Sequence, residues 1–201
     1  MKWIFSFRRE VLFIVFCFLF FFSPLLWTGS EAFAQQAWWT WLHGTAGAAP
    51  GNWGTQGVPA ASNEPPSMYK TDACWTDSQG NFWFYGGELQ HTALWKYSPV
   101  TNMWTWMKGS NVAAQPPVYG TKGVPAAGNN PPYMSLGGLT WIDAQDNLWL
   151  LGGVNSTYAD LWKYDPITNM WTWMHGPGGP VGIGNYGEKG VSSPTNLPSP
   201  R

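Results

Sequence analysis

Hydrophobic residues in the second half of the chain gather in short runs, and polar turns separate one run from the next. Between residues 138 and 176 these runs are GLTWID (138–143), LWLLGG (148–153), DLWKYDP (160–166) and MWTWMHG (170–176). Such runs predict β-strands, and their short connections predict antiparallel pairing of neighbours. In the last run Trp171 and Trp173 alternate with Thr172, which is the two-residue period of a strand. No segment after residue 34 shows helical periodicity, so we expect an all-β fold.

The same order of runs occurs twice. The segment LWKYSPVTNMWTWMKG (94–109) returns as LWKYDPITNMWTWMHG (161–176). Two further pairs match, GTQGVPAASNEPPSM (54–68) with GTKGVPAAGNNPPYM (120–134), and WTDSQGNFWFYGG (75–87) with WIDAQDNLWLLGG (141–153). A third copy opens with GNYGEKGV (184–191), and an isolated WWTWLHG (38–44) repeats the last strand. A four-stranded antiparallel unit in tandem is the blade of a β-propeller, which must stack on other blades to bury both apolar faces.

Two glycines close the second strand of each copy, and a tyrosine and a tryptophan follow with six residues between them. This combination resembles the kelch repeat. Its longer form, W-x-D-x-x-x-N-x-W-x-x-G-G followed by L-W-K-Y-x-P-x-T-N-x-W-T-W, is similar to kelch-type proteins that bacteria export, which belong to the galactose-oxidase-like propellers. The motif residues are Gly86, Gly87, Tyr97, Trp104, Gly152, Gly153, Tyr164 and Trp171. The resemblance implies an all-β, kelch-type β-propeller segment with two four-stranded antiparallel blades and a lone N-terminal strand.

The motif residues are expected to build the scaffold and to perform no chemistry. Paired glycines let the backbone leave the second strand with dihedral angles that other residues avoid. The tyrosine and tryptophan rings are expected to fill the wedge between blades, with their O–H and N–H groups bonded to neighbouring backbone.

These patterns divide the chain into five regions. They are a signal peptide (1–34), a lone strand (35–50), blade 1 (51–109), blade 2 (110–176) and a linker to a missing blade (177–201). The copies exceed the kelch unit of about 50 residues, and the extra length is expected to form a long loop over 108–134. Closed propellers have at least about four blades, so two blades and an isolated fourth strand predict a truncated reading frame or the front of a longer protein. The alternative is that several copies associate to complete a ring.

The first 34 residues predict a secretory signal. Lys2, Arg8 and Arg9 precede a long apolar run, and the small-x-small pattern ends at Ala34. Basic start, apolar middle and A-x-A end predict cleavage after Ala34, which gives a secreted, periplasmic or cell-surface protein that meets the membrane only through this segment. An uncleaved anchor is the alternative, but the run is marginal for the roughly 20 residues of a membrane span.

Composition and charge exclude several classes. With a net charge of −1, 10% charged residues and 16 tryptophans, the chain has neither the composition of a disordered protein nor the basic patches of a nucleic-acid-binding protein. After residue 34 Cys74 is the only cysteine, so no internal disulfide can form and stability must come from packing. Cys74 is expected to be a buried apolar residue rather than a reactive thiol.

Candidate chemistry is sparse. His43, Lys108 and His175 occupy one repeat position, but a lysine among them favours a polar strand end over a metal site. Asp77 and Asp143 recur at turns, where Asx-type capping explains them. The copper site of galactose oxidase has no counterpart here, so that activity is not carried over, and neither a cofactor nor a catalytic residue is predicted.

One recurring feature of the long loops is a candidate for ligand binding. Trp53, Tyr119 and Tyr186 are equivalent aromatics, each followed by glycine, and could stack on sugar rings or contact a protein. The alternative is that each ring packs on the adjacent blade. We therefore expect an exported, non-enzymatic binding or scaffold module with a protein or carbohydrate ligand. The alternatives are a fragment of a galactose-oxidase-like or sugar-modifying enzyme whose active residues lie elsewhere, and a fragment that does not fold alone.

Overall fold

The computed structural model describes residues 40–68, 71–87, 90–135, 137–153 and 157–200. The chain divides into two compact units, Met1–Leu42 and His43–Arg201, and all strands of the described residues lie in the second unit. The predicted signal peptide falls outside the described residues. Within the described ranges there is no helix with the length and apolar character needed to cross a bilayer.

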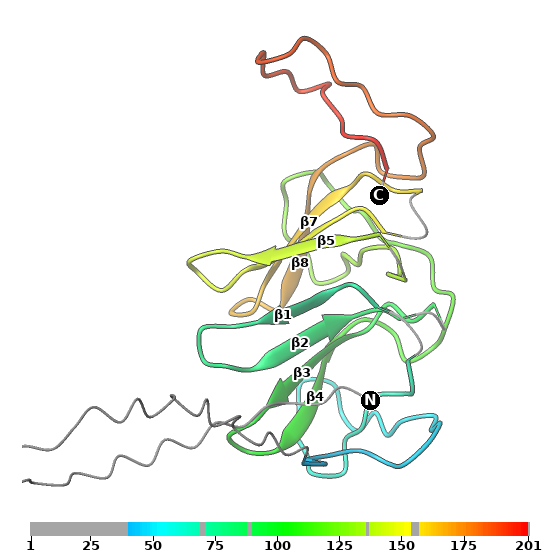
Figure 1. The fold of residues 1–201 in the computed structure, drawn as a ribbon, viewed down its shortest axis with the longest axis vertical. Coiled ribbons are helices and arrows are strands. Elements are labelled where there is room, and N and C mark those ends of the chain that lie inside the picture. The colour runs from blue at the N-terminus through cyan, green and yellow to red at the C-terminus, as the bar shows by residue number, and fades with distance from the viewer. Residues whose placement is uncertain (1–39, 69–70, 88–89, 136, 154–156, 201) are drawn as a thin grey trace, which may run out of the picture. The chain divides into compact units, whose positions relative to one another are not determined.

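Two four-stranded antiparallel sheets make up the second unit (Figure 1). The first contains β1 (Cys74–Thr76), β2 (Phe82–Tyr85), β3 (Leu94–Ser98) and β4 (Met103–Lys108), and the second contains β5 (Leu139–Ile142), β6 (Leu148–Leu151), β7 (Leu161–Asp165) and β8 (Met170–His175). In each sheet the strands are ordered as in the sequence. The expected all-β class and antiparallel pairing are thus confirmed, and the sheets are not closed into a ring.

A hydrogen-bonded unit of Asp, Asn and Trp closes the hairpin between β5 and β6. Asp143 Oδ1 accepts from the backbone N–H groups of Gln145 and Asn147, each at 3.0 Å. Asp143 Oδ2 accepts from Trp149 Nε1 at 2.8 Å and from Asn147 Nδ2 at 2.9 Å. Burial raises the pKa of Asp143, but these hydrogen bonds outweigh burial and lower it to about 2. The expected Asx-type capping is confirmed, and Asp77 makes the equivalent contacts in the β1–β2 hairpin.

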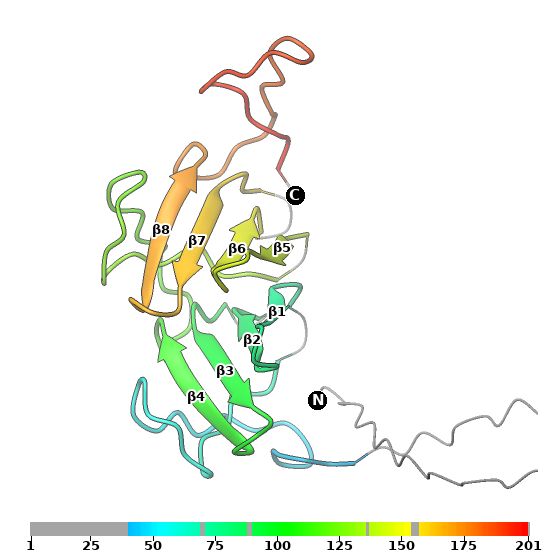
Figure 2. The same ribbon diagram turned by 90° about the vertical axis from the view of Figure 1, so that its left-hand side faces the viewer.

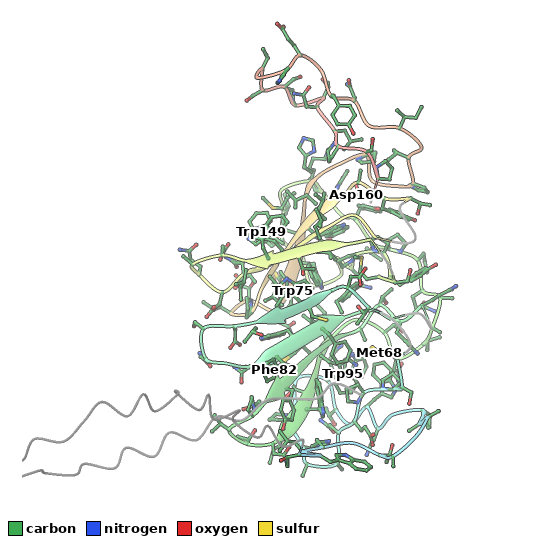
Figure 3. The ribbon with its side chains drawn as sticks, viewed as in Figure 1. Met68, Trp75, Phe82, Trp95, Trp149 and Asp160 are labelled. Atoms are coloured by element: carbon green, nitrogen blue, oxygen red, sulfur yellow. The ribbon has the colours of Figure 1, made fainter. Side chains whose placement is uncertain are left out.

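Aromatic side chains join the two sheets, which lie side by side (Figures 2 and 3). Trp75 on β1 donates from Nε1 to the backbone oxygen of Trp149 on β6 at 3.0 Å. The ring of Tyr85 meets that of Trp171 with 5.4 Å between centroids, and Trp83 meets Tyr164 at 5.9 Å. One continuous core therefore contains residues of both sheets.

The motif tyrosines and tryptophans only partly meet the expectation from the sequence. Tyr164 and Trp171 do fill the space between the sheets, where both are buried. The tyrosine hydroxyl, however, donates to the side chain of the turn residue Asn169 at 2.9 Å rather than to backbone, and Nε1 of Trp171 is buried without a hydrogen-bond partner. The expectation that these two side chains hydrogen-bond to neighbouring backbone is therefore wrong. The hydroxyl of Tyr164 bonds to the turn asparagine, and the indole of Trp171 is held by packing alone.

The paired glycines behave as expected. Gly86 and Gly87 have φ angles of 76° and 132°, and Gly152 and Gly153 have 80° and 119°. Side chains strongly disfavour these values. A Cβ at Gly86 would also lie 2.6 Å from the backbone nitrogen of Met134, so the chain passes here too closely for any other residue.

Folded loops precede the first sheet, connect the two sheets and follow the second sheet. Each contains a loop whose ends pair through backbone hydrogen bonds, and we name these the first (52–64), second (118–130) and third (185–197) loop repeats. The first lies against β4 and the second against β8, linked by bridges from Ala60 to Trp104 and from Ala126 to Trp171. The expected long loop over 108–134 thus covers the edge of β8, whose carbonyl groups would otherwise be unpaired.

The expected lone strand over 35–50 is not seen in its described part, because residues 40–50 contain no strand. Trp38 and Trp39 lie outside the described residues. Serine and glutamate side chains fix the course of this segment instead, since Ala49 N donates to Ser67 Oγ at 2.6 Å and Thr45 N donates to Glu64 Oε1 at 2.6 Å.

Candidate functional site

The three loop aromatics predicted as ligand-binding residues occupy two different environments. Trp53 lies in an aromatic cluster of the first repeat, with ring centroids 5.1 Å from those of Trp95 and Trp106 and 5.4 Å from that of His91. Trp95 lies on β3, Trp106 lies on β4, and His91 lies in the connection from β2 to β3. The ring of Trp53 therefore joins the first loop repeat to the first sheet.

Tyr119 occupies the equivalent place in the second repeat and adds a polar contact. Its ring centroid lies 5.1 Å from those of Trp162 and Trp173, and its hydroxyl donates to Asp160 Oδ2 at 2.8 Å. Burial raises the pKa of Tyr119, and the hydrogen bond to Asp160 raises it further. Asp160 is itself fully buried and also accepts from Gly178 N at 2.8 Å.

Tyr186 in the third loop repeat differs from both. Its side chain is 66% exposed, and its hydroxyl shares a 2.8 Å hydrogen bond with Ser199 Oγ. The structure therefore does not bring Trp53, Tyr119 and Tyr186 together on one surface. Trp53 and Tyr119 hold loops to sheets, whereas the side chain of Tyr186 is mostly exposed.

A cleft of about 330 Å³ lies where the connections after β2 and β4 meet the second loop repeat. Its walls come from Gln56, Thr92, Lys108–Ser110, Gln115, Pro116, Val118 and residues 127–130. Lys108 is the one charged side chain among them, and its Nζ donates to the backbone oxygen of Ala127 at 2.7 Å. Burial lowers the pKa of Lys108. An ammonium has three N–H donors, so two remain for a bound group.

A smaller cleft of about 230 Å³ lies near the opposite ends of the strands. It contains Asp77, Lys96 and Asp146, and Lys96 Nζ lies 5.2 Å from the centroid of the Trp83 ring. Asp146 accepts from the backbone N and the Oγ of Ser78, a contact between the two sheets. The polar groups of the smaller cleft thus mainly bond to other groups of the protein, which makes this cleft a poorer ligand site than the larger one.

The described residues hold no group of three or more His, Cys, Asp and Glu side chains that could bind a metal ion. His43 lies against Tyr97, with 6.3 Å between ring centroids, while Lys108 lines the larger cleft. The equivalence of His43, Lys108 and His175 in the sequence therefore does not gather them at one site. Cys74 is a free thiol of intermediate exposure beside the core of the first sheet.

Sequence reasoning missed two sets of residues. The asparagines Asn63 and Asn129 are buried and donate from Nδ2 to backbone oxygens of β4 and β8. Their recurrence at one place in each loop repeat, with Asn196 in the third, was the available signal. Asp160 had no such signal, because the equivalent residue is Ala93.

Comparison with known proteins identifies no relative: no protein-family model and no curated protein sequence matches the chain. The kelch resemblance accordingly depends on the motif residues and their spacing.

Proposed function

We propose that the chain is an exported, non-enzymatic binding module built of kelch-type propeller blades, and that it binds an acidic carbohydrate in the cleft beside Lys108. The observation that carries this proposal is the combination of one cation with many neutral polar groups in a cleft of about 330 Å³. Small-molecule sites of about 300 Å³ and more are large enough to enclose a sugar residue.

The polar groups of the cleft suit a hydroxylated ligand. Gln56 and Gln115 donate from their Nε2 atoms to the backbone oxygens of Gly109 and Ala113, at 3.2 and 3.3 Å. Each also carries an amide oxygen, which is an acceptor of the kind that binds sugar hydroxyl groups. The two remaining N–H groups of Lys108 suit a carboxylate, since a hydrogen bond between charged partners is about twice as strong as a neutral one.

The walls of the cleft are held by the blades, which favours binding without rearrangement. The second loop repeat bonds to β8 through Asn129 Nδ2 and through the backbone of Ala126. Lys108 is the last residue of β4, and its ammonium is fixed on Ala127 O. Fixed side chains lower the entropy that binding must overcome.

Binding can be measured by calorimetry with a galacturonic acid oligosaccharide and a neutral gluco-oligosaccharide of the same length. We expect the acidic sugar to bind and added salt to weaken it. Lys108→Met should weaken its binding at least about tenfold, the equivalent of about 1.4 kcal/mol. Lys163→Met, which removes a lysine outside the cleft, is the matched control. No binding of either sugar, or equal loss in both variants, rules the proposal out.

We also propose that the protein is exported and cleaved after Ala34. The basic start, apolar run and A-x-A end of residues 1–34 support this. Mass spectrometry of the protein from its host should give a chain that begins at Gln35. A chain that retains Met1 in the membrane fraction would instead support the anchor alternative.

A further inference from the structure

The cleft beside Lys108 contains a buried hydroxyl group that the fold itself does not use. Thr92, in the connection from β2 to β3, lines the cleft and is fully buried. Among the described residues its Oγ1 has no hydrogen-bond partner. A buried hydroxyl without a partner lowers the stability of a protein, because its hydrogen bonds to water are lost and nothing replaces them. Such a group in a folded protein requires an explanation.

A second polar atom of the same cleft is in the same situation. Asn130, at the end of the second loop repeat, lines the cleft, and its Oδ1 is buried with no partner in the part of the chain that the structure describes. The backbone of Asn130 is fixed, because its N–H donates to Val118 O at 2.9 Å and its carbonyl accepts from Val118 N at 2.8 Å. The cleft thus holds two buried polar atoms without partners besides the ammonium of Lys108.

The corresponding places of the other repeats show that the fold does not require these two groups to be unpaired. The equivalent of Thr92 in the second repeat is Ala159, which is also buried, so a methyl group is sufficient for packing there. The equivalent of Asn130 in the first loop repeat is Glu64. Its Oε1 accepts from Thr45 N at 2.6 Å and from Thr45 Oγ1 at 2.9 Å. In the first loop repeat an acceptor at this position is therefore satisfied by an N–H and a hydroxyl of the chain.

The second loop repeat lacks this internal donor. Ser110 is the equivalent of Thr45, since each follows the glycine that ends the Trp-Thr-Trp segment. Ser110 also lines the cleft, but its Oγ accepts from Val112 N at 2.9 Å within its own turn. The oxygen of Asn130 is thus left for a donor that enters the cleft from outside the chain.

We propose that Thr92 Oγ1 and Asn130 Oδ1 bind hydroxyl groups of the sugar residue whose carboxylate Lys108 binds. This inference rests on the proposed function and adds the residues that select the ligand. Asn130 Oδ1 accepts from a sugar hydroxyl, as Glu64 accepts from the hydroxyl of Thr45. Thr92 Oγ1 both donates and accepts, so it bonds to a hydroxyl of either orientation. A site built in this way rejects an analogue without those hydroxyl groups, because its own buried polar groups then stay unpaired.

Calorimetry with two ligands of equal length tests the inference. The first is a galacturonic acid oligosaccharide, and the second is the same oligosaccharide acetylated on its secondary hydroxyl groups, which keeps the carboxylates and removes the hydroxyl donors. We expect Thr92→Val and Asn130→Leu each to weaken binding of the first ligand by about three- to tenfold, the contribution of one neutral hydrogen bond. Each variant should also narrow the preference for the first ligand over the second. Rejection of the acetyl groups by their bulk alone would leave that preference unchanged.

Stability separates a ligand-binding role of Thr92 from a structural one. Thr92→Val removes a buried hydroxyl that has no partner, so the midpoint of urea denaturation should stay the same or rise. Thr140→Val is the matched control, because Thr140 lies on β5 and its Oγ1 donates to Cys74 O at 3.2 Å. This control should lower the midpoint and leave the binding of both oligosaccharides unchanged.

The outcomes distinguish this inference from the proposed function. A parent protein that binds neither oligosaccharide overturns both. Binding that Lys108→Met weakens, but that Thr92→Val and Asn130→Leu leave unchanged, overturns this inference alone and leaves ordered water as the partner of the two groups. Binding that Thr92→Val and Asn130→Leu weaken, but Lys108→Met does not, supports this inference and overturns the role of the cation. A lower midpoint in Thr92→Val with equal loss for both ligands also overturns the inference, since the hydroxyl then has a structural role.

Discussion

Exchanging one pair of residues between the two repeats tests how the loop aromatics are held. The second repeat pairs Tyr119 with the buried Asp160, and the same positions of the first repeat hold Trp53 and Ala93. The phenol donates to the carboxylate at 2.8 Å, whereas the larger indole packs where only a methyl group stands opposite. Each combination is self-consistent, so mixed combinations should be unstable.

The structure gives the size of the effect. Tyr119→Phe removes one hydrogen bond to the carboxylate, which contributes about 1.5–3 kcal/mol. Asp160→Ala leaves the hydroxyl of Tyr119 and the N–H of Gly178 without their acceptor, while Trp173 Nε1 keeps His175 O at 2.9 Å. At about 1–3 kcal/mol for each of these two unsatisfied groups, the free energy of unfolding should fall by about 2–6 kcal/mol. In Tyr119→Trp with Asp160→Ala the unsatisfied hydroxyl is gone, so the double variant should lose at least about 1 kcal/mol less than the sum of its single changes.

Urea denaturation followed by tryptophan fluorescence measures these free energies. The reciprocal change in the first repeat, Ala93→Asp alone and with Trp53→Tyr, is the matched control, and there too the double variant should recover part of the loss. Additive effects within about 0.5 kcal/mol in both repeats would refute the pairing, because they would show that the aromatic and the residue opposite do not interact.

Three further predictions concern the contacts between sheets, the loop asparagines and acid stability. Trp75→Phe should lower the free energy of unfolding by about 1–3 kcal/mol because a hydrogen bond between the sheets is lost. Trp141→Phe, at the equivalent exposed position, should change it by less than about 0.5 kcal/mol. Equal losses in urea denaturation would contradict a stabilising role for the hydrogen bond of Trp75 to the second sheet. Asn129→Ala should lower the free energy of unfolding by about 1–3 kcal/mol, because it leaves carbonyl groups of the strand and of the loop unpaired. Asn196→Ala should lower it less in the same assay. The reverse order would count against the stabilisation of β8 by the second loop repeat. The free energy of unfolding should decline as the pH falls from about 4 towards 2, because the folded-state pKa of Asp143 is about 2 against an ordinary value of 3.8. The contribution of the carboxylate is present above its ordinary pKa and is lost as the carboxyl takes up a proton. Asp143→Asn should flatten this part of the pH profile of stability, and an unchanged profile would exclude the carboxyl as the cause.

The strands and their turns could be predicted from sequence because the forces that form them are local. Alternating tryptophans around Thr172 place that segment in a strand, and an aspartate four residues before an asparagine caps the hairpin between β5 and β6. The paired glycines after β2 and β6 have the positive φ angles that their residue type implies. Each of these signals is contained within a few consecutive residues.

The environments of the candidate ligand residues could not be predicted from the sequence. Trp53, Tyr119 and Tyr186 occupy equivalent positions in the repeat, yet the first two pack on the sheet that follows them and the third is exposed. The cleft beside Lys108 combines the end of β4 with loops far away in sequence, so no short motif marks it. Its polar character depends on which backbone oxygens the glutamine and lysine side chains reach.

Residues close together in the chain were sufficient to predict the all-β class, the two repeats of four antiparallel strands, the hairpin caps and the glycine turns. Which of two equivalent residues is part of the core depends instead on the packing of one sheet against the other. Trp75 is 5% exposed because the second sheet covers it, while Trp141, at the equivalent position of the second repeat, is 43% exposed. Burial is a property of what lies against a side chain, and that partner comes from a distant part of the fold.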